Sequence, residues 1–344
     1  MRIEAGGAFY DIDNDNDLDL VFGGDGSSNQ IWWWENPLPD GDVTAPWTRR
    51  LIKDSGNNRH HDLIFADIDG DGADELVFWN QAANALFTTE IPANPRQAEP
   101  WLDMDTGDNV YTITTVPSPK YEGLALGDIN QDGKIDLVGG GYWFEHISDH
   151  NFTAHPIAPA EWIRVAVGQL IPGGKPEVIQ SPGEEAGTAK WYEWNGSSWI
   201  GHDLDEVINA HSLEVGDVNA DGSLDIFIAE MAFEETDTAN HNPNARTLVF
   251  LGDGQGNFTE TVVATGFGQH ESRIADLDGD DDLDILGKPY SWDTPRLDIW
   301  LNDGPGNGSG GEVCESLDDW NRYVIGDSGT HRNVFVSSGR LGWR

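Results

Sequence analysis

Residues 67–72 read DIDGDG, a short phrase with acidic side chains at alternate positions and two glycines. Close relatives of this phrase recur at 11–17 (DIDNDND), 128–133 (DINQDG), 217–222 (DVNADG) and 276–282 (DLDGDDD). A degenerate copy, in which Gln169 takes the first position, lies between the third and the fourth of them. Successive copies begin about 40 to 60 residues apart, which is the size of one propeller blade.

Apolar runs surround each acidic phrase in a fixed order. One run precedes the phrase, as in LIFAD, and another follows it, as in LDLVFGG. A third, aromatic-rich run comes next in most repeats, as in QIWWWEN, and a fourth, such as WTRRLIK, precedes the next phrase. Runs of about four to eight β-branched and aromatic residues between turn residues are typical of strands. The repeat therefore predicts an all-β fold, a β-propeller of four-stranded antiparallel blades.

The number of blades follows from the number of complete repeats. Six repeats are complete, and HRNVFVSSG (331–339) supplies only the innermost strand of a seventh. We expect residues 1–344 to form a single seven-bladed domain with a partial last blade. The alternatives are a six-bladed ring with an extra terminal strand and a chain truncated at its C-terminus.

Composition limits the partners. The 61 acidic residues outnumber the 19 basic ones and give a formal charge of −42, which repels nucleic-acid phosphates and anionic lipids. We therefore expect no nucleic-acid partner and no membrane insertion, and no run approaches the roughly 18 apolar residues of a membrane span. Cys314 is the single cysteine, so no internal disulfide can staple the loops. The first residues do not resemble a secretion signal, so export would be encoded elsewhere or its signal removed.

The acidic phrase has the spacing of a calcium loop. Ca²⁺ takes six to eight oxygens, and such a loop offers carboxylates at positions 1, 3 and 5, a carbonyl at 7 and a further acid. One loop alone could be a solvated acidic turn, but five in register favour the metal, and Mg²⁺ seldom uses such all-protein cages. We expect about five Ca²⁺ ions, with binding coupled to folding because crowded carboxylates repel one another.

The degenerate copy has Gln169, Ile171 and Gly173 at the ligand positions, so we expect no metal there. The predicted ligands of the five acidic loops are Asp11, Asp13, Asp15 and Asp19; Asp67, Asp69, Asp71 and Glu75; Asp128, Asn130, Asp132 and Asp136; Asp217, Asn219, Asp221 and Asp225; and Asp276, Asp278, Asp280 and Asp284.

The D-x-[DN]-x-D-G-x-x-[DE] loop between two apolar strands resembles the FG-GAP or VCBS-type repeat propellers, which include the integrin α-subunit head and many bacterial extracellular proteins. The resemblance covers nearly the whole chain. It implies a propeller, bound calcium and an extracellular or periplasmic location. It is a poor guide to function, because the fold hosts adhesion modules, lectins and enzymes.

Candidate functional residues lie where the innermost strands begin. The acidic loop joins the first strand of a blade to the second, so the starts of the first strands lie on the opposite face, around the channel mouth. Long second-to-third connections at 229–246 and 287–296 open on that face, and long loops often carry function. Candidate catalytic residues are His211, His270, Tyr121, Arg164, Arg273 and Glu122. Candidate ligand-binding residues are His60, His61, Trp162, Glu214, Glu271, Lys288, Tyr290, Trp292, His331 and Arg332.

Two classes of function compete for this ring, against the simpler interpretation that polar residues merely cap solvent-exposed strand ends. In the first, aromatic platforms stack on sugar rings while His, Glu and Arg bind hydroxyls or carboxylates. We therefore predict an extracellular, calcium-stabilised, monomeric propeller that binds polysaccharide through this face. The residue types also resemble the channel-mouth clusters of propeller polysaccharide lyases and some rhamnosidases.

The second class is an enzyme. In a lyase, Arg164 or Arg273 would neutralise a uronate carboxylate, His211 or His270 would act as base, and Tyr121 would protonate the leaving oxygen. In a glycoside hydrolase the carboxylates to test are Glu122, Glu214 and Glu271. A protein-adhesion module is a further alternative. So is a transition metal such as Zn²⁺ held by His61, His211 and His270.

Overall fold

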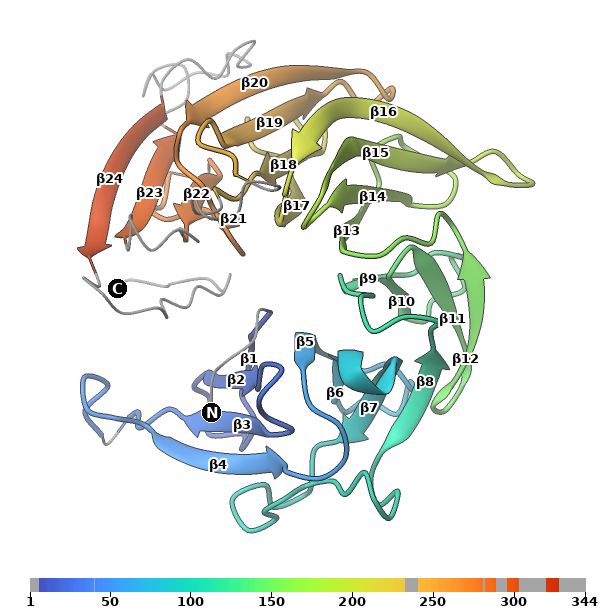
Figure 1. Ribbon diagram of the computed structural model, residues 1–344, viewed down its shortest axis with the longest axis vertical. Coiled ribbons are helices and arrows are strands. Elements are labelled where there is room, and N and C mark those ends of the chain that lie inside the picture. Colours follow the sequence, from blue (N-terminus) through green and yellow to red (C-terminus); the bar gives the residue numbers. More distant parts are fainter. Residues whose placement is uncertain are drawn as a thin grey trace. The chain divides into compact units, whose positions relative to one another are not determined.

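Twenty-four strands form six four-stranded antiparallel sheets in the computed structural model, which describes residues 6–39, 41–232, 241–280, 282–288, 296–302 and 320–327. The strands of each four-stranded sheet follow one another along the chain, as Figure 1 shows. The predicted β-propeller of four-stranded blades is thereby confirmed. The strand expected at 331–339 lies outside the described residues.

Each blade contains four consecutive strands, paired in chain order. Blade 1 comprises β1 (Ala8–Tyr10), β2 (Asp19–Gly23), β3 (Ile31–Glu35) and β4 (Thr48–Lys53). Blade 2 comprises β5 (His60–Ala66), β6 (Glu75–Asn80), β7 (Ala85–Glu90) and β8 (Tyr111–Thr115), with a short 3₁₀ helix, η1 (Gln81–Ala83), between β6 and β7. Blade 3 comprises β9 (Ala125–Gly127), β10 (Asp136–Gly139), β11 (Tyr142–Ser148) and β12 (Asn151–Pro156).

The remaining three blades repeat this order. Blade 4 comprises β13 (Ile163–Gly168), β14 (Glu177–Pro182), β15 (Ala186–Trp194) and β16 (Trp199–Ile208). Blade 5 comprises β17 (Ser212–Gly216), β18 (Asp225–Ala229), β19 (Arg246–Gly252) and β20 (Phe258–Thr265). Blade 6 comprises β21 (Arg273–Ala275), β22 (Asp284–Gly287), β23 (Arg296–Asn302) and β24 (Trp320–Asp327).

The chain divides into two compact units, Met1–Glu161 and Trp162–Arg344, which we call unit 1 and unit 2. Unit 1 holds blades 1 to 3 and unit 2 holds blades 4 to 6. No helix among the described residues has the length and apolar character needed to cross a bilayer.

Second strands are buried on both faces, which explains their continuous apolar runs. Alternate side chains of a strand point to opposite faces. In β6, Leu76 and Phe78 therefore pack into a core cluster shared with blade 1, whereas Val77 and Trp79 pack into one shared with blade 3. β18 of unit 2 is divided in the same way between two clusters.

No apolar run in the sequence located β8, the fourth strand of blade 2. It follows a long connection, residues 91–110, that holds Arg96 and a segment paired with β4 through the amide of Trp101, which donates to Ile52 O at 2.9 Å. The apolar run of YTITT is short, and only Ile113 is buried in it. A weak pattern after a long connection is therefore the reason why this strand was missed.

Candidate functional site

The acidic loops connect the first strand of a blade to the second, and those of blades 1, 3 and 5 share one hydrogen-bond pattern. Asp217 Oδ1 accepts the amide of Asp221 at 3.0 Å and its Oδ2 accepts that of Gly222 at 2.8 Å. Asp128 makes the same pair of bonds in blade 3, at 3.0 and 2.9 Å. The sixth loop residue has a left-handed backbone, with φ of 87° at Gly222, which favours glycine there.

Carboxylate oxygens converge inside these loops. In blade 1, oxygens of Asp11, Asp13 and Asp15 lie within 4.8 Å of one another. Burial raises the pKa of Asp13 and Asp17 to about 6, an effect that the neighbouring Asp15 increases and Arg96 reduces. A crowded, all-oxygen donor set of this kind fits a hard divalent cation such as Ca²⁺. The corresponding aspartates of blade 2, Asp67, Asp69 and Asp71, converge in the same way.

The last acid of each loop is buried and accepts hydrogen bonds from backbone amides. Asp225 is inaccessible to solvent, and it accepts the amide of Val218 at 2.8 Å and that of Gly252 at 2.8 Å. It thereby ties the beginning of the loop to the end of the third strand. Asp19, Asp136 and Asp284 make the equivalent two bonds. The sequence predicted these last acids only as metal ligands. That role stays a prediction, whereas their hydrogen bonds to backbone amides are seen in the structure.

Burial also changes the acidity of these groups. It raises the pKa of Asp225 and Asp19 to about 7, of Glu75 to about 8 and of Asp284 to about 6, against the lowering effect of the backbone amides. Either a proton or a cation close to these carboxylates would relieve the cost of burying them.

The degenerate loop of blade 4 keeps the buried acid without the loop carboxylates. Glu177 Oε2 accepts the amides of Leu170 at 2.7 Å and Ile171 at 3.1 Å. Gln169 Nε2 donates to the carbonyl oxygens of Ile171 at 2.6 Å and Gly173 at 3.1 Å. A side-chain amide therefore binds the carbonyls inside this loop.

Third strands add a glutamate beside the loop in four blades, a feature that the sequence reasoning missed. Each of these glutamates has a cationic or imidazole partner: Glu35 contacts Arg96, Glu90 contacts His150, Glu145 contacts His155 and Glu193 contacts His202. The signal was present, since the aromatic third runs of these blades read WWWE, FTTE, WFE and WYE.

In unit 1, the predicted residues at the first-strand starts form a buried cluster. His61 Nδ1 lies 2.8 Å from Asp62 Oδ2, and His61 Nε2 lies 3.6 Å from Glu122 Oε2. Asp62 Oδ2 also accepts the amide of Gly123 at 2.8 Å, and Gln81 donates to Glu122 at 3.3 Å. These bonds join blade 2 to blade 3.

Two other predicted residues of unit 1 lie in the core. His60 is inaccessible to solvent and packs near Phe78, and burial lowers its pKa to about 3. Tyr121 is 7% exposed and packs against Tyr142 in the core cluster shared by blades 2 and 3. Neither ring presents a face to solvent in this arrangement, so packing explains both residues.

In unit 2, seven predicted residues come together at the starts of β13, β17 and β21 and the end of β22. We call them the unit 2 cluster: Arg164, His211, Glu214, His270, Glu271, Arg273 and Lys288. Arg164, His211, His270 and Glu271 are all at most 9% exposed.

Glu271 is the centre of this cluster. Its Oε1 lies 3.0 Å from His211 Nδ1 and 3.3 Å from Arg164 Nη2, and its Oε2 lies 3.6 Å from Arg273 Nη2. Burial alone would raise the pKa of Glu271, but Arg164, His211 and Arg273 hold it well below its ordinary value. The carboxylate is therefore ionised across the physiological range.

The remaining members extend the network. Arg273 Nη1 lies 2.8 Å from Glu214 Oε1, and the amide of Ile274 donates to Glu214 Oε2 at 2.7 Å. The His211 and His270 rings stack with centroids 4.3 Å apart, and Lys288 Nζ lies 3.0 Å from His270 Nδ1. Burial lowers the pKa of Lys288.

One residue of this cluster and one residue beside it have left-handed backbones. The φ angles are 57° at Glu271 and 55° at Trp162, which is uncommon for residues other than glycine. Such conformations cost free energy and gather at functional sites, where the surrounding structure holds them. Trp162 is half-buried. Tyr290, Trp292, His331 and Arg332 of the predicted ring lie outside the described residues.

The family follows from the loops. Residues 11–78, which include the acidic loops of blades 1 and 2, match the FG-GAP-like repeat family. The chain is a β-propeller with an FG-GAP-like repeat. Outside the matched segment, the same acidic phrase recurs in blades 3, 5 and 6 of this FG-GAP propeller. No curated protein sequence matches it.

Several solved structures are similar to this FG-GAP propeller at low identity. A chain of the Tc holotoxin pore of Photorhabdus luminescens is 13% identical with a TM-score of 0.40; 87% of this chain is covered, but this chain spans only 13% of that one. The V. cholerae biofilm matrix protein Bap1 is 11% identical with a TM-score of 0.40; the match covers 94% of this chain and 70% of Bap1. The SapL1 lectin, in complex with α-methyl fucoside, is 14% identical with a TM-score of 0.45; the match covers 88% of this chain and 95% of the lectin chain.

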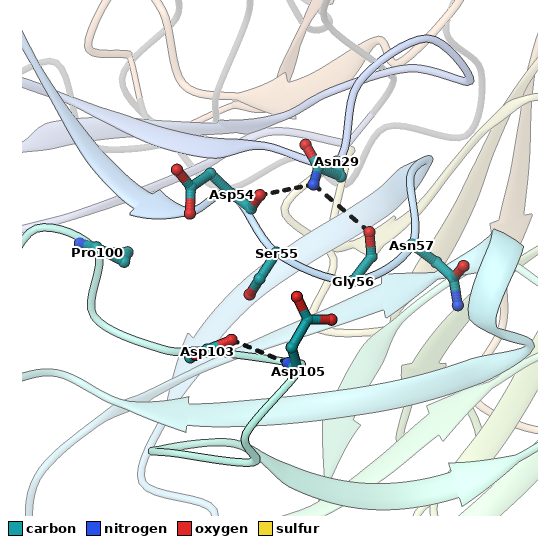
Figure 2. A pocket seen from close by; sticks show the side chains of 8 residues that line it. All are labelled: Asn29, Asp54, Ser55, Gly56, Asn57, Pro100, Asp103 and Asp105. Atoms are coloured by element: carbon teal, nitrogen blue, oxygen red, sulfur yellow. Dashed lines mark hydrogen bonds between the residues drawn. The ribbon is translucent and has the colours of Figure 1, made fainter.

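The FG-GAP propeller also has a polar cavity in unit 1, shown in Figure 2. It is lined by Asn29, Asp54, Ser55, Gly56, Asn57, Pro100, Asp103 and Asp105. Asn29 Nδ2 donates to Asp54 O at 2.6 Å, and the buried Lys53 ammonium donates to Asn29 O at 2.7 Å and Asn57 O at 3.1 Å. Burial lowers the pKa of Lys53 to about 8. These bonds hold the cavity wall together.

Proposed function

We propose that this FG-GAP propeller is an extracellular, calcium-stabilised module that binds an anionic polysaccharide through the unit 2 cluster. One observation carries the proposal: Arg164, Arg273 and Lys288 gather in one place, in a chain with 61 acidic and only 19 basic residues. A concentration of cations against so negative a background is the feature that an anionic ligand would recognise.

The charges of the cluster favour an anion over a metal. Three cationic side chains oppose two carboxylates, and each carboxylate already has an arginine partner. His211, His270 and Glu271 bring ligand atoms within 4.8 Å of one another, as a metal site would require. The adjacent Arg164 and Arg273 would repel a metal ion there, whereas they suit the carboxylate of a uronate or a sulfate group.

A sugar ligand is favoured by the aromatic residue beside these cations. Trp162 is half-buried at the start of β13, two residues before Arg164. Aromatic side chains commonly present an apolar face to a sugar ring while neighbouring polar groups bind its substituents. This pairing of ring and cation fits one unit of an acidic glycan.

Calcium would act in this proposal as a structural ion. Asp67, Asp69 and Asp71 of blade 2 and the matching residues of the other acidic loops would hold it, and it would neutralise their crowded charges. Weak calcium sites are filled where calcium is millimolar, which is the condition outside cells. The extracellular location rests on this argument.

Affinity electrophoresis and calorimetry would test the proposal on the calcium-loaded protein. Polygalacturonate, alginate and dextran sulfate are the anionic probes, and dextran is the neutral one. We expect salt-sensitive binding to anionic polymers, at least tenfold weaker in Lys288→Ala and Arg273→Gln. Lys190→Ala is the matched control, because Lys190 lies on β15 of the same unit and pairs with Asp203. Equal retention of dextran and the anionic polymers would overturn the anionic specificity, and no retention would favour protein adhesion.

Cleavage of a uronate chain is the second candidate function, favoured by the 3.0 Å contact between Glu271 and His211. A carboxylate that orients a histidine is the usual arrangement around a general base. Release of unsaturated uronate from the same polymers would establish a lyase. A hydrolase fits less well, because its general acid needs a raised pKa, whereas the pKa of Glu271 is lowered.

A further inference from the structure

Three side chains from two blades of unit 1 converge beside the acidic loop of blade 2. Asp69 belongs to that loop, Glu90 is the last residue of β7, and His150 lies in the turn between β11 and β12 of blade 3. His150 Nε2 lies 3.0 Å from Glu90 Oε1 and 3.8 Å from Asp69 Oδ2, and the three ligand atoms all lie within 4.8 Å of one another. We propose that they form a site for a divalent transition-metal ion such as Zn²⁺.

The distances suit such an ion. Bonds of roughly 2.0–2.2 Å in a tetrahedral zinc site place neighbouring ligand atoms roughly 3.2–3.6 Å apart. The two measured separations lie on either side of that range, so small side-chain rotations would bring all three atoms onto one ion. An imidazole nitrogen also selects against Ca²⁺, which takes oxygen ligands, and favours zinc-like metals.

The histidine is held in place by its surroundings. Its ring stacks on Tyr111 of β8, with centroids 3.6 Å apart and planes 20° from parallel. The side chain of His150 is 15% exposed and that of Glu90 is 32% exposed. The site is therefore oriented from within the protein and still reachable by an ion from solvent, with a fourth position left for water.

The equivalent place in blade 1 already holds a cation. Arg96 Nη2 lies 2.6 Å from Asp13 Oδ2, and Arg96 Nε lies 2.5 Å from Glu35 Oε1. Asp13 and Glu35 are the blade 1 counterparts of Asp69 and Glu90. A guanidinium at this point in one blade is independent support for a cation at the same point in the next.

Blades 3 and 4 show what distinguishes blade 2. His155 contacts Glu145 at 2.7 Å and stacks on Trp143, and His202 contacts Glu193 at 3.4 Å and stacks on Trp191. The loop residue that corresponds to Asp69 is Asn130 in blade 3 and Ile171 in blade 4. Among these four blades, Asp, Glu and His come together in blade 2, which makes His155 a matched control.

Cobalt titration of the full chain, in buffer saturated with calcium, tests the inference. We expect one equivalent of Co²⁺ to give the intense visible absorption of a tetrahedral site, which excess Zn²⁺ removes. His150→Ala and Glu90→Gln should each weaken Co²⁺ binding at least tenfold, whereas His155→Ala should leave it unchanged.

Circular dichroism and the calcium-loaded melt identify any variant that fails to fold, and Glu90→Gln is the variant that best preserves shape. Unchanged cobalt affinity in folded His150→Ala would overturn the proposal. So would an octahedral spectrum or the absence of Co²⁺ binding in the calcium-saturated buffer.

Discussion

The backbone amide of Leu170 donates to Glu177 Oε2 at 2.7 Å, inside the loop that lacks the acidic ligand positions. Ile68 and Glu75 make the same contact at 3.0 Å in blade 2, where those positions are acidic. Because the bond exists in both kinds of loop, its acid has a structural role that needs no metal.

Replacing Glu177 should therefore destabilise the protein. Glu177→Ala leaves one buried and one half-buried amide without their acceptor, which costs about 1–3 kcal/mol. Glu177→Gln keeps an acceptor oxygen and should recover most of that loss. Urea unfolding followed by fluorescence measures both variants. Equal stability of Glu177→Ala and the parent chain would show that the bond contributes nothing.

Calcium removal should lower the melting temperature by roughly 10 °C or more, because a ligand bound only to the folded state stabilises it. Asp217→Ala should reproduce part of this loss in calcium buffer. Gln169→Ala should lower the melting temperature equally with and without calcium. In its loop, the Gln169 side-chain amide donates hydrogen bonds at the place where the other loops have carboxylates. A melt unaffected by EDTA would remove the basis for the calcium proposal.

Arg96 should matter most when calcium is absent. It contacts Asp13 and Asp15 in the first loop as well as Glu35. Its side chain is 41% exposed, so solvent screens these contacts and Arg96→Ala should cost about 0.2–1 kcal/mol in EDTA. The variant should also bind one calcium ion more tightly, because the guanidinium no longer competes. Calorimetry measures the calcium affinity of both proteins. Weaker calcium binding by Arg96→Ala than by the parent chain would show that Arg96 helps to hold the ion and does not compete with it.

His60 should make unit 1 sensitive to acid. Its pKa falls from 6.5 to about 3 on burial, so the unfolded chain binds the proton that the folded chain refuses. Its stability contribution is thus complete above pH 6.5 and is lost as pH falls from there towards about 3. His60→Leu should flatten the stability profile in that window. A profile identical to that of the parent chain would contradict this assignment.

The repeat and its strands could be predicted from the sequence because each blade restates the same order of apolar runs. The convergence of Arg164, His211 and Glu271 was also predictable, since they begin successive first strands. The acidic phrase predicted converging carboxylates but not the backbone bonds of Asp225, because a local spacing does not reveal a contact with the third strand.

Other parts of the site depend on long-range contacts. Nothing near Arg96 in the sequence connects it to Asp13, 83 positions earlier by their numbers. His150 likewise reaches Glu90 from the next blade. Tyr121 and His60 were expected at a surface, but the sequence could not reveal that their rings turn into the core.

The interior of the loop between the first and second strands is stabilised differently in different blades. Carboxylates gather there in most blades, a guanidinium from the following blade enters it in the first, and the amide of Gln169 closes it in the fourth. These three arrangements of the loop differ from one another by very few side chains. The dependence of such a protein on an external ion can therefore be raised or lowered one repeat at a time, by single substitutions that leave the architecture unchanged.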